Sequence, residues 1–165
     1  MSMEYIGVGR IQLTSHSTQP PQQNHKLISA YVSFLVYDYS SGVWQFQGYG
    51  FVPNGTSGTA IMQIHHTTYG ATVLMLMVVH DQLKFYHSTV VESNIYDRWM
   101  RLNVIHDVDA NKKTVFIDGV KKLQTEGNVP YTYYFKCGVY AQGDEAHCCS
   151  EELHRHRICL YKNGE

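Results

Sequence analysis

The sequence predicts an all-β fold, an antiparallel sandwich or barrel, and two observations carry this prediction. First, the 165 residues contain about ten short strand-like runs at roughly 8–12-residue spacing, separated by Gly, Pro, Asn and Asp turn signals. Second, the 3.6-residue periodicity of amphipathic helices is almost absent. With 44% hydrophobic residues, a chain of this size buries a substantial core. We expect a single domain over residues 1–165.

The first half of the chain alternates strand-like runs with turn signals. A polar segment with paired prolines, Ser15–Lys26, is typical of a loop. Turns are expected at Ser40-Ser41-Gly42 and at Pro53-Asn54-Gly55. The strands predicted between these signals are Tyr5–Thr14, Leu27–Tyr39 as one long strand or two, Val43–Val52 and Thr59–His65.

The second half continues the pattern. A hairpin is expected around His80-Asp81, and Asp118-Gly119 is typical of a tight hairpin turn. Two segments, Glu92–Trp99 and Asp144–His154, are weak candidates for helical turns. The predicted strands are Thr72–Val79, Gln82–His87, Trp99–Asp107, Thr114–Asp118, Val120–Leu123, Tyr131–Gln142 and Arg155–Tyr161.

Two of these strands carry polar side chains on one face only. Side chains alternate along a strand, so Gln63 and His65 share a face of the first strand. On the second, Lys136, Tyr140 and Gln142 share a face, while Phe135, Cys137 and Val139 lie on the other. If the two strands lie in one sheet, their polar faces form a patch that suits an anionic, hydroxyl-rich ligand such as an acidic sugar.

Composition excludes several classes of partner. The net charge is −1, and Lys and Arg form no block, so nucleic acid and anionic membranes are poor partners. No apolar run reaches the ~18–20 residues that span a bilayer. No secretory signal is visible at the N-terminus, so the expected location is cytoplasmic, or secreted or vacuolar if a leader was removed. No Gly-rich phosphate loop is present, no cofactor is expected, and the oligomeric state stays open.

The four cysteines do not form a disulfide scaffold in a chain of this length. Cys137 falls on the apolar face of its strand and is expected in the core. Near the C-terminus, His and Cys are unusually frequent, and His154 and His156 would share a strand face, which suits two metal nitrogens. No C-x-x-C pair accompanies them, so incidental content is the favoured interpretation. The weak metal-ligand candidates are His147, His154, His156 and Cys159.

Several stretches closely resemble the plant citrate-binding proteins, which belong to the alginate-lyase-2 superfamily, that of polysaccharide lyase family seven. The most specific motifs are Q-I-H at residues 63–65 and Y-F-K-x-G-x-Y-x-Q at 134–142. Supporting stretches are Y-D-Y-S-S-G-V-W-Q-F at 37–46, G-Y-G-F-V-P-N-G-T-S-G at 48–58 and N-I-Y-D-R-W at 94–99. The resemblance implies a β-jelly-roll sandwich of two curved antiparallel sheets with a concave groove. Residues 1–36 do not resemble the usual N-terminus of the family.

By similarity, the groove binds polyuronate and supports β-elimination, in which a base removes the proton next to the sugar carboxylate and an acid protonates the leaving oxygen. The resemblance assigns catalysis to His65, as base or neutralising donor, and to Tyr140, either as acid alone or as both acid and base. Gln63 would help to neutralise the carboxylate, and Lys136 and Gln142 would line the groove.

The chain departs from the family in one motif. The family carries R-[TS]-E-[LIV]-R on an earlier strand, where this chain has S-A-Y-V-S-F at residues 29–34. Three hypotheses follow. The leading one is a protein that binds a small carboxylate or an acidic saccharide. The second is a β-eliminating polyuronate lyase that acts without the arginine. The third is a plant metabolite enzyme that uses the His/Tyr groove for proton transfer.

Overall fold

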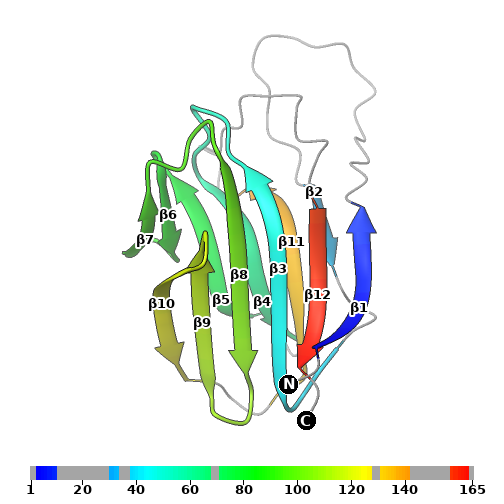
Figure 1. Ribbon diagram of the computed structural model, residues 1–165. Helices are drawn as coiled ribbons and strands as arrows, with labels where there is room; N and C mark the ends of the chain where they lie inside the picture. Colours follow the sequence, from blue (N-terminus) through cyan, green and yellow to red (C-terminus); the bar gives the residue numbers. More distant parts are fainter. Residues whose placement is uncertain are drawn as a thin grey trace, which may run out of the picture.

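The computed structural model describes residues 3–10, 30–33, 38–67, 71–127, 131–141 and 157–163, with side chains described for 38–67, 71–127, 131–138 and 140. These residues form two antiparallel six-stranded sheets packed face to face (Figure 1). The fold is the predicted all-β jelly-roll sandwich. No helix long and apolar enough to cross a membrane occurs in the described part of the chain.

The sheet nearer the viewer in Figure 1, here called the front sheet, has the order β1-β12-β3-β8-β9-β10. Its strands are β1 (Met3–Arg10), β12 (Arg157–Asn163), β3 (Val43–Phe51), β8 (Trp99–Asp107), β9 (Lys112–Ile117) and β10 (Val120–Glu126). The back sheet has the order β2-β11-β4-β5-β6-β7. Its strands are β2 (Ala30–Ser33), β11 (Tyr133–Ala141), β4 (Thr59–His66), β5 (Thr72–Val79), β6 (Gln82–Phe85) and β7 (Thr89–Ser93).

One hydrophobic core lies between the sheets and draws side chains from both. On β8 the burial alternates strictly, with Met100, Leu102 and Val104 directed inward, as a half-buried strand requires. Phe135 of β11 is fully buried, and its ring centroid lies 6.0 Å from the ring centroid of Phe46 on β3. Inward side chains of β11 and β4 therefore anchor one face of each strand and leave the other face of the back sheet for function.

The two predicted hairpins are confirmed. His80 and Asp81 join β5 to β6 with φ of 45° and 60°. Asp118 and Gly119 join β9 to β10 with φ of 51° and 87°. Positive φ at both central residues is the geometry that matches the right-handed twist of paired strands. These turns set the register of β5 against β6 and of β9 against β10.

One expectation is wrong. The segment Glu92–Trp99 contains no helical turn, because its first residues belong to the edge strand β7. Tyr96 instead forms a bridge with Val52, and its amide donates to the Asp81 carboxylate over 2.8 Å. Strand β7 is short and mostly exposed, so its sequence shows little of the apolar–polar alternation that predicts a strand. The expected helix at Asp144–His154 and the loop at Ser15–Lys26 fall outside the described residues.

Candidate functional site

The two strands that carry the polar motifs are direct neighbours. In the antiparallel register of β4 with β11, His65 lies opposite Tyr134 and Gln63 lies opposite Lys136. Residues directly opposite each other in an antiparallel pair share a face. The motif side chains therefore meet on the face of the back sheet that points away from the core, here called the site face.

Two bulges place Ala60 opposite Tyr140 on the site face. β4 carries an extra residue relative to β5 between Ala60 and Met62, and β11 carries one relative to β4 between Cys137 and Tyr140. A bulge changes which face the following residues occupy. Gly138 lies within the β11 bulge with φ of 138°, a conformation that glycine adopts without the steric cost of a Cβ. Ala60 leaves room for the phenol above it.

Gln63 organises the centre of the site face. Its Oε1 lies 3.1 Å from His65 Nε2, and its Nε2 donates to Met75 Sδ over 3.3 Å. The imidazole also stacks on the Tyr134 ring, with centroids 5.3 Å apart and planes 14° apart. Because Gln63 is only 4% exposed, its amide is fixed beneath the surface. It holds His65 in one orientation, while the imidazole itself is half-buried.

Lys136 and Tyr140 form the other end of the site. The Lys136 Nζ lies 4.5 Å from the Tyr140 ring centroid, a cation–π geometry. Burial lowers the pKa of Lys136 below 10.5, because a partly desolvated ammonium is less favourable than one in water. Tyr140 is 37% exposed, so part of its side chain reaches the surface of the site.

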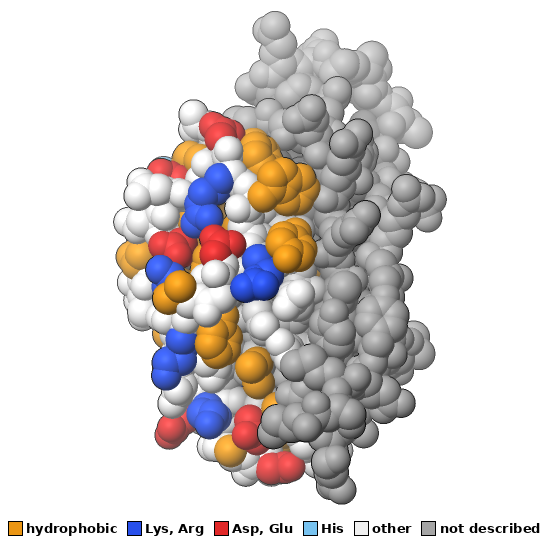
Figure 2. Space-filling view, viewed as in Figure 1, with side chains coloured by type: hydrophobic (Ala, Val, Ile, Leu, Met, Phe, Trp, Pro, Cys, Tyr) orange, Lys and Arg blue, Asp and Glu red, His pale blue; other side chains and the backbone are white. Residues whose placement is uncertain are grey.

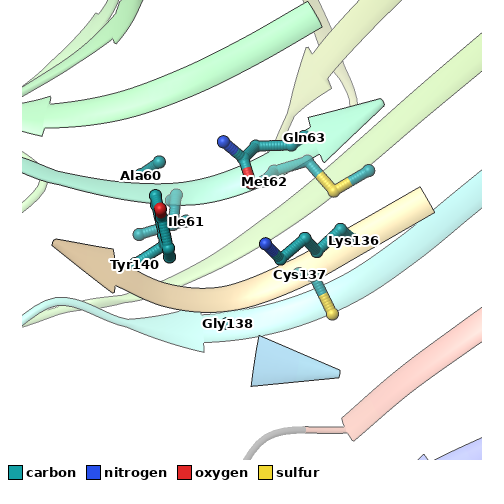
Figure 3. Close-up of a pocket in the computed structure, with 8 residues that line it drawn as sticks. All are labelled: Ala60, Ile61, Met62, Gln63, Lys136, Cys137, Gly138 and Tyr140. Atoms are coloured by element: carbon teal, nitrogen blue, oxygen red, sulfur yellow. The ribbon is translucent and has the colours of Figure 1, made fainter. Parts of the chain in front are cut away.

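A shallow depression of about 140 Å³ lies between these side chains, lined by residues 60–63, 136–138 and Tyr140. Figure 3 shows β11 curving beneath it, with Lys136 and Tyr140 on the concave side of the strand and Cys137 on the other. This volume includes open solvent above the surface, so the depression encloses no cavity. The described side chains therefore form an open floor on which a ligand lies, rather than a closed cavity.

The departure from the family motif borders this site. β2 pairs with β11, and Ser33 lies opposite Lys136 while Tyr31 lies opposite Gly138. The strand that carries arginine and glutamate in the family is therefore next to the site, but serine and tyrosine occupy these two positions. Across β2, β11, β4 and β5, the residues paired in one row are Ser33, Lys136, Gln63 and Met75. Lys136 is the only cation among the described residues of this row.

The other sequence predictions have mixed outcomes. Cys137 is 5% exposed in the core, as expected, and burial raises its pKa to about 12. His66 lies on the face opposite His65 and stacks on Tyr131. Gln142, His147, His154 and His156 lie outside the described residues, and Cys159 lies in β12, where side chains are not described. Within the side chains that are described, no group of three or more His, Cys, Asp or Glu is placed to hold a metal.

Two residues of the site were not singled out from the sequence. Tyr134 shares its face with Lys136 by simple alternation, so the pattern of β11 already contained the signal. Met75 lies opposite Gln63 on β5, and its contact with the amide depends on a register that only the folded sheet reveals.

Comparison with known proteins agrees with this architecture. The family Alginate_lyase2, described as alginate lyase, matches residues 23–161. A citrate-binding protein from Hevea brasiliensis is 46% identical over 127 residues, which are 77% of this chain and 53% of that protein. The chain thus spans about half the length of this curated relative.

Solved structures share the fold. An alginate lyase from Corynebacterium sp. superposes with a TM-score of 0.52 at 19% identity, over 76% of this chain and 58% of that chain. A family 7 alginate lyase, A1-II′, in complex with product gives a TM-score of 0.57 at 13% identity, over 86% and 72% of the two chains. Since the family match extends over most of the sequence and the jelly roll is the same, the chain belongs to the Alginate_lyase2 family.

Proposed function

We propose that the site face binds a carboxylate-bearing ligand, either a citrate-like acid or a uronate sugar. The observation that carries this proposal is that two side-chain contacts, Tyr140 with Lys136 and Gln63 with His65, lie side by side because Lys136 and Gln63 are paired across β11 and β4. Together they offer an ammonium, a phenol and an imidazole on one open surface. The names of the relatives, a citrate-binding protein and alginate lyases, support a ligand of this class.

Each group has a distinct task in this proposal. The Lys136 ammonium pairs with the carboxylate, and partial burial strengthens that pairing because the local dielectric is lower than in water. Tyr140 and His65 donate to or accept from ligand hydroxyls on either side. Gln63 is too deeply buried to be the main contact, so it acts chiefly by orienting His65.

A β-eliminating polyuronate lyase is the second candidate. It is favoured by the presence of both an imidazole and a phenol on one face, which supplies a base and an acid. The serine opposite Lys136 weighs against it. Loss of one fixed donor to developing negative charge costs about 2.7–4 kcal/mol in the transition state, a larger penalty than ground-state binding suffers. We therefore place binding first.

A panel of citrate, other small organic acids and polyuronates tests both candidates on wild type, His65→Ala and Tyr140→Phe. Thermal stabilisation by an acid or uronate, lost or weakened in the variants, with no gain in ultraviolet absorbance, supports binding. An absorbance gain from the unsaturated uronate product, abolished in Tyr140→Phe, would instead establish the lyase.

A third result is equally informative. If no compound of the panel stabilises the protein and none is turned over, both candidates are contradicted and the metabolite enzyme is favoured. Unfolding of each variant without ligand serves as the control, because it separates loss of the site from loss of the fold.

A further inference from the structure

Met75 fixes the far end of the amide that orients His65. The Gln63 Nε2 lies 3.3 Å from Met75 Sδ, and the Gln63 Oε1 lies 3.1 Å from His65 Nε2. A thioether sulfur accepts hydrogen bonds and cannot donate them, so Gln63 turns its NH₂ group to Met75 and its oxygen to the imidazole. His65 therefore donates from Nε2. Met75 thus sets the orientation of the amide and, through the amide, the tautomer of His65.

Met75 is also the most accessible of the methionines whose side chains are described. Met62, Met77 and Met100 are 0%, 0% and 2% exposed, whereas Met75 is half-buried. It lies opposite Gln63 on the neighbouring strand, which places it on the site face rather than in the core. A thioether at the surface meets dissolved oxidants that a close-packed core keeps out, and oxidation to the sulfoxide is the common chemistry of accessible methionine.

The front sheet offers no competing site among its described side chains. Figure 2 shows its outward face, where basic, acidic and hydrophobic side chains are intermixed. Met100, the one described methionine side chain of that sheet, lies on the core side of β8. Cys137 is protected as well, because burial raises its pKa to about 12 and the thiolate is the form that is oxidised. Within the described part of the chain, Met75 is therefore the residue that an oxidant reaches first.

Oxidation of this sulfur changes its contact with Gln63. Hydrogen peroxide transfers one oxygen atom to the sulfur, so that its O–O bond breaks, a sulfur–oxygen bond forms and water leaves. The sulfoxide accepts at its new oxygen rather than at its sulfur. The 3.3 Å between Sδ and Gln63 Nε2 is already a direct contact, with no room for another atom in between. The amide must turn to follow the oxygen or lose its partner, and either change moves the acceptor that faces His65.

We propose that Met75 is an oxidative modification site that controls the orientation of His65. Conversion of its thioether to the sulfoxide by a peroxide releases the imidazole from the position that Gln63 imposes, and reduction of the sulfoxide restores that position. The consequence for ligand affinity rests on the proposed function. The modification itself and the movement of His65 do not depend on any ligand.

The test treats the full chain with hydrogen peroxide under native conditions and uses three readouts. Mass spectrometry of peptides locates each added oxygen atom, nuclear magnetic resonance follows the imidazole signals of His65, and calorimetry measures affinity for citrate and for a uronate tetramer. Thermal unfolding before and after treatment verifies that each protein stays folded.

Three variants accompany wild type. Met75→Leu keeps an apolar side chain of similar volume and has no sulfur to oxidise. Met75→Gln carries a side-chain carbonyl oxygen, which imitates the oxygen of the sulfoxide. Met77→Leu is the matched control, because it removes the sulfur of a fully buried methionine two residues along the same strand.

Reduction separates methionine oxidation from cysteine oxidation. Dithiothreitol alone reverses disulfides and sulfenic acids, whereas methionine sulfoxide needs the two sulfoxide reductases, one for each epimer at sulfur. The treated chain is therefore measured after dithiothreitol alone and after dithiothreitol with both reductases.

We expect Met75 to be oxidised before Met62, Met77 and Met100, and the His65 signals to shift in step with it. Affinity should fall roughly fivefold to tenfold, as for a lost hydrogen bond at the site. Only the reductases should reverse both changes. Peroxide should affect Met77→Leu as it affects wild type and leave the His65 signals of Met75→Leu unmoved. Untreated Met75→Gln should resemble oxidised wild type.

Two results would overturn the inference. One is oxidation of the buried methionines ahead of Met75, and the other is complete oxidation of Met75 with unmoved His65 signals. If the His65 signals move as expected but wild type binds neither citrate nor the tetramer, the modification site stands and the proposed function alone is contradicted.

Discussion

Gln63→Leu is the change that most specifically tests how the site is organised. It keeps the side-chain volume nearly constant but removes the acceptor 3.1 Å from His65 Nε2 and the donor 3.3 Å from Met75 Sδ. One lost contact is a weak bond to sulfur, and His65 is half-exposed, so water replaces its partner. We therefore expect stability to fall by only about 1 kcal/mol. For a 165-residue chain this lowers Tm by about 2–4 °C.

As a fraction of the total free energy, Gln63→Leu should weaken ligand binding more than it weakens folding. Without the amide, His65 is no longer held in one orientation, and affinity for the stabilising acid or uronate should fall roughly fivefold to tenfold. Calorimetric titration measures the affinity, and scanning calorimetry measures Tm. The matched control is Gln45→Leu, at a residue 6% exposed on β3 of the front sheet, which should leave affinity unchanged. Wild-type affinity in Gln63→Leu would refute the role assigned to the amide.

Three further predictions address the fold and its titration. Phe135→Ala, at a side chain that is 0% exposed, should lower the free energy of unfolding by about 3–5 kcal/mol in urea titrations; a loss below 1 kcal/mol would contradict its place in the core. Gly119→Ala puts a Cβ 2.8 Å from Arg101 Nη2 at φ of +87°. The left-handed backbone alone should lower the free energy of unfolding by about 1–2 kcal/mol in the same assay. An unchanged urea midpoint would argue against this turn. Because the pKa of Lys136 is lowered from 10.5 in the fold, the unfolded chain keeps this proton to higher pH. Between the pKa of Lys136 in the folded chain and its pKa in the unfolded chain, stability should therefore rise with pH. Over the same range the affinity for citrate should fall. Lys136→Arg should keep its affinity across that range. A wild-type affinity that stays constant up to pH 10.5 would exclude the ammonium as the anion contact.

Much of the fold was predictable because alternation and turn chemistry are local signals. The strands Thr72–Val79 and Trp99–Asp107 have the predicted bounds. The glycine or aspartate at each hairpin has the positive φ that the turn requires. β7 was missed because a short, largely exposed edge strand has neither clear alternation nor an apolar face. The jelly roll itself came from the family resemblance, since strand spacing alone does not distinguish it from other sandwiches.

For the site, the sequence predicted which residues share a face of one strand, but not which residues lie opposite each other on neighbouring strands. Alternation placed Lys136 and Tyr140 on one face, and their contact at 4.5 Å confirms this. The bulges that put Ala60 opposite Tyr140 have no marker in the sequence of β4. Long-range register is a property of the folded sheet.

A nuclear magnetic resonance titration of the isotope-labelled chain with citrate and with a uronate tetramer tests the central claim most directly. We predict that the shifted signals cluster at His65, Lys136 and Tyr140 for whichever compound binds. Shifts confined to front-sheet residues, or saturating binding that leaves β4 and β11 unchanged, would show that the ligand binds elsewhere and would contradict the account.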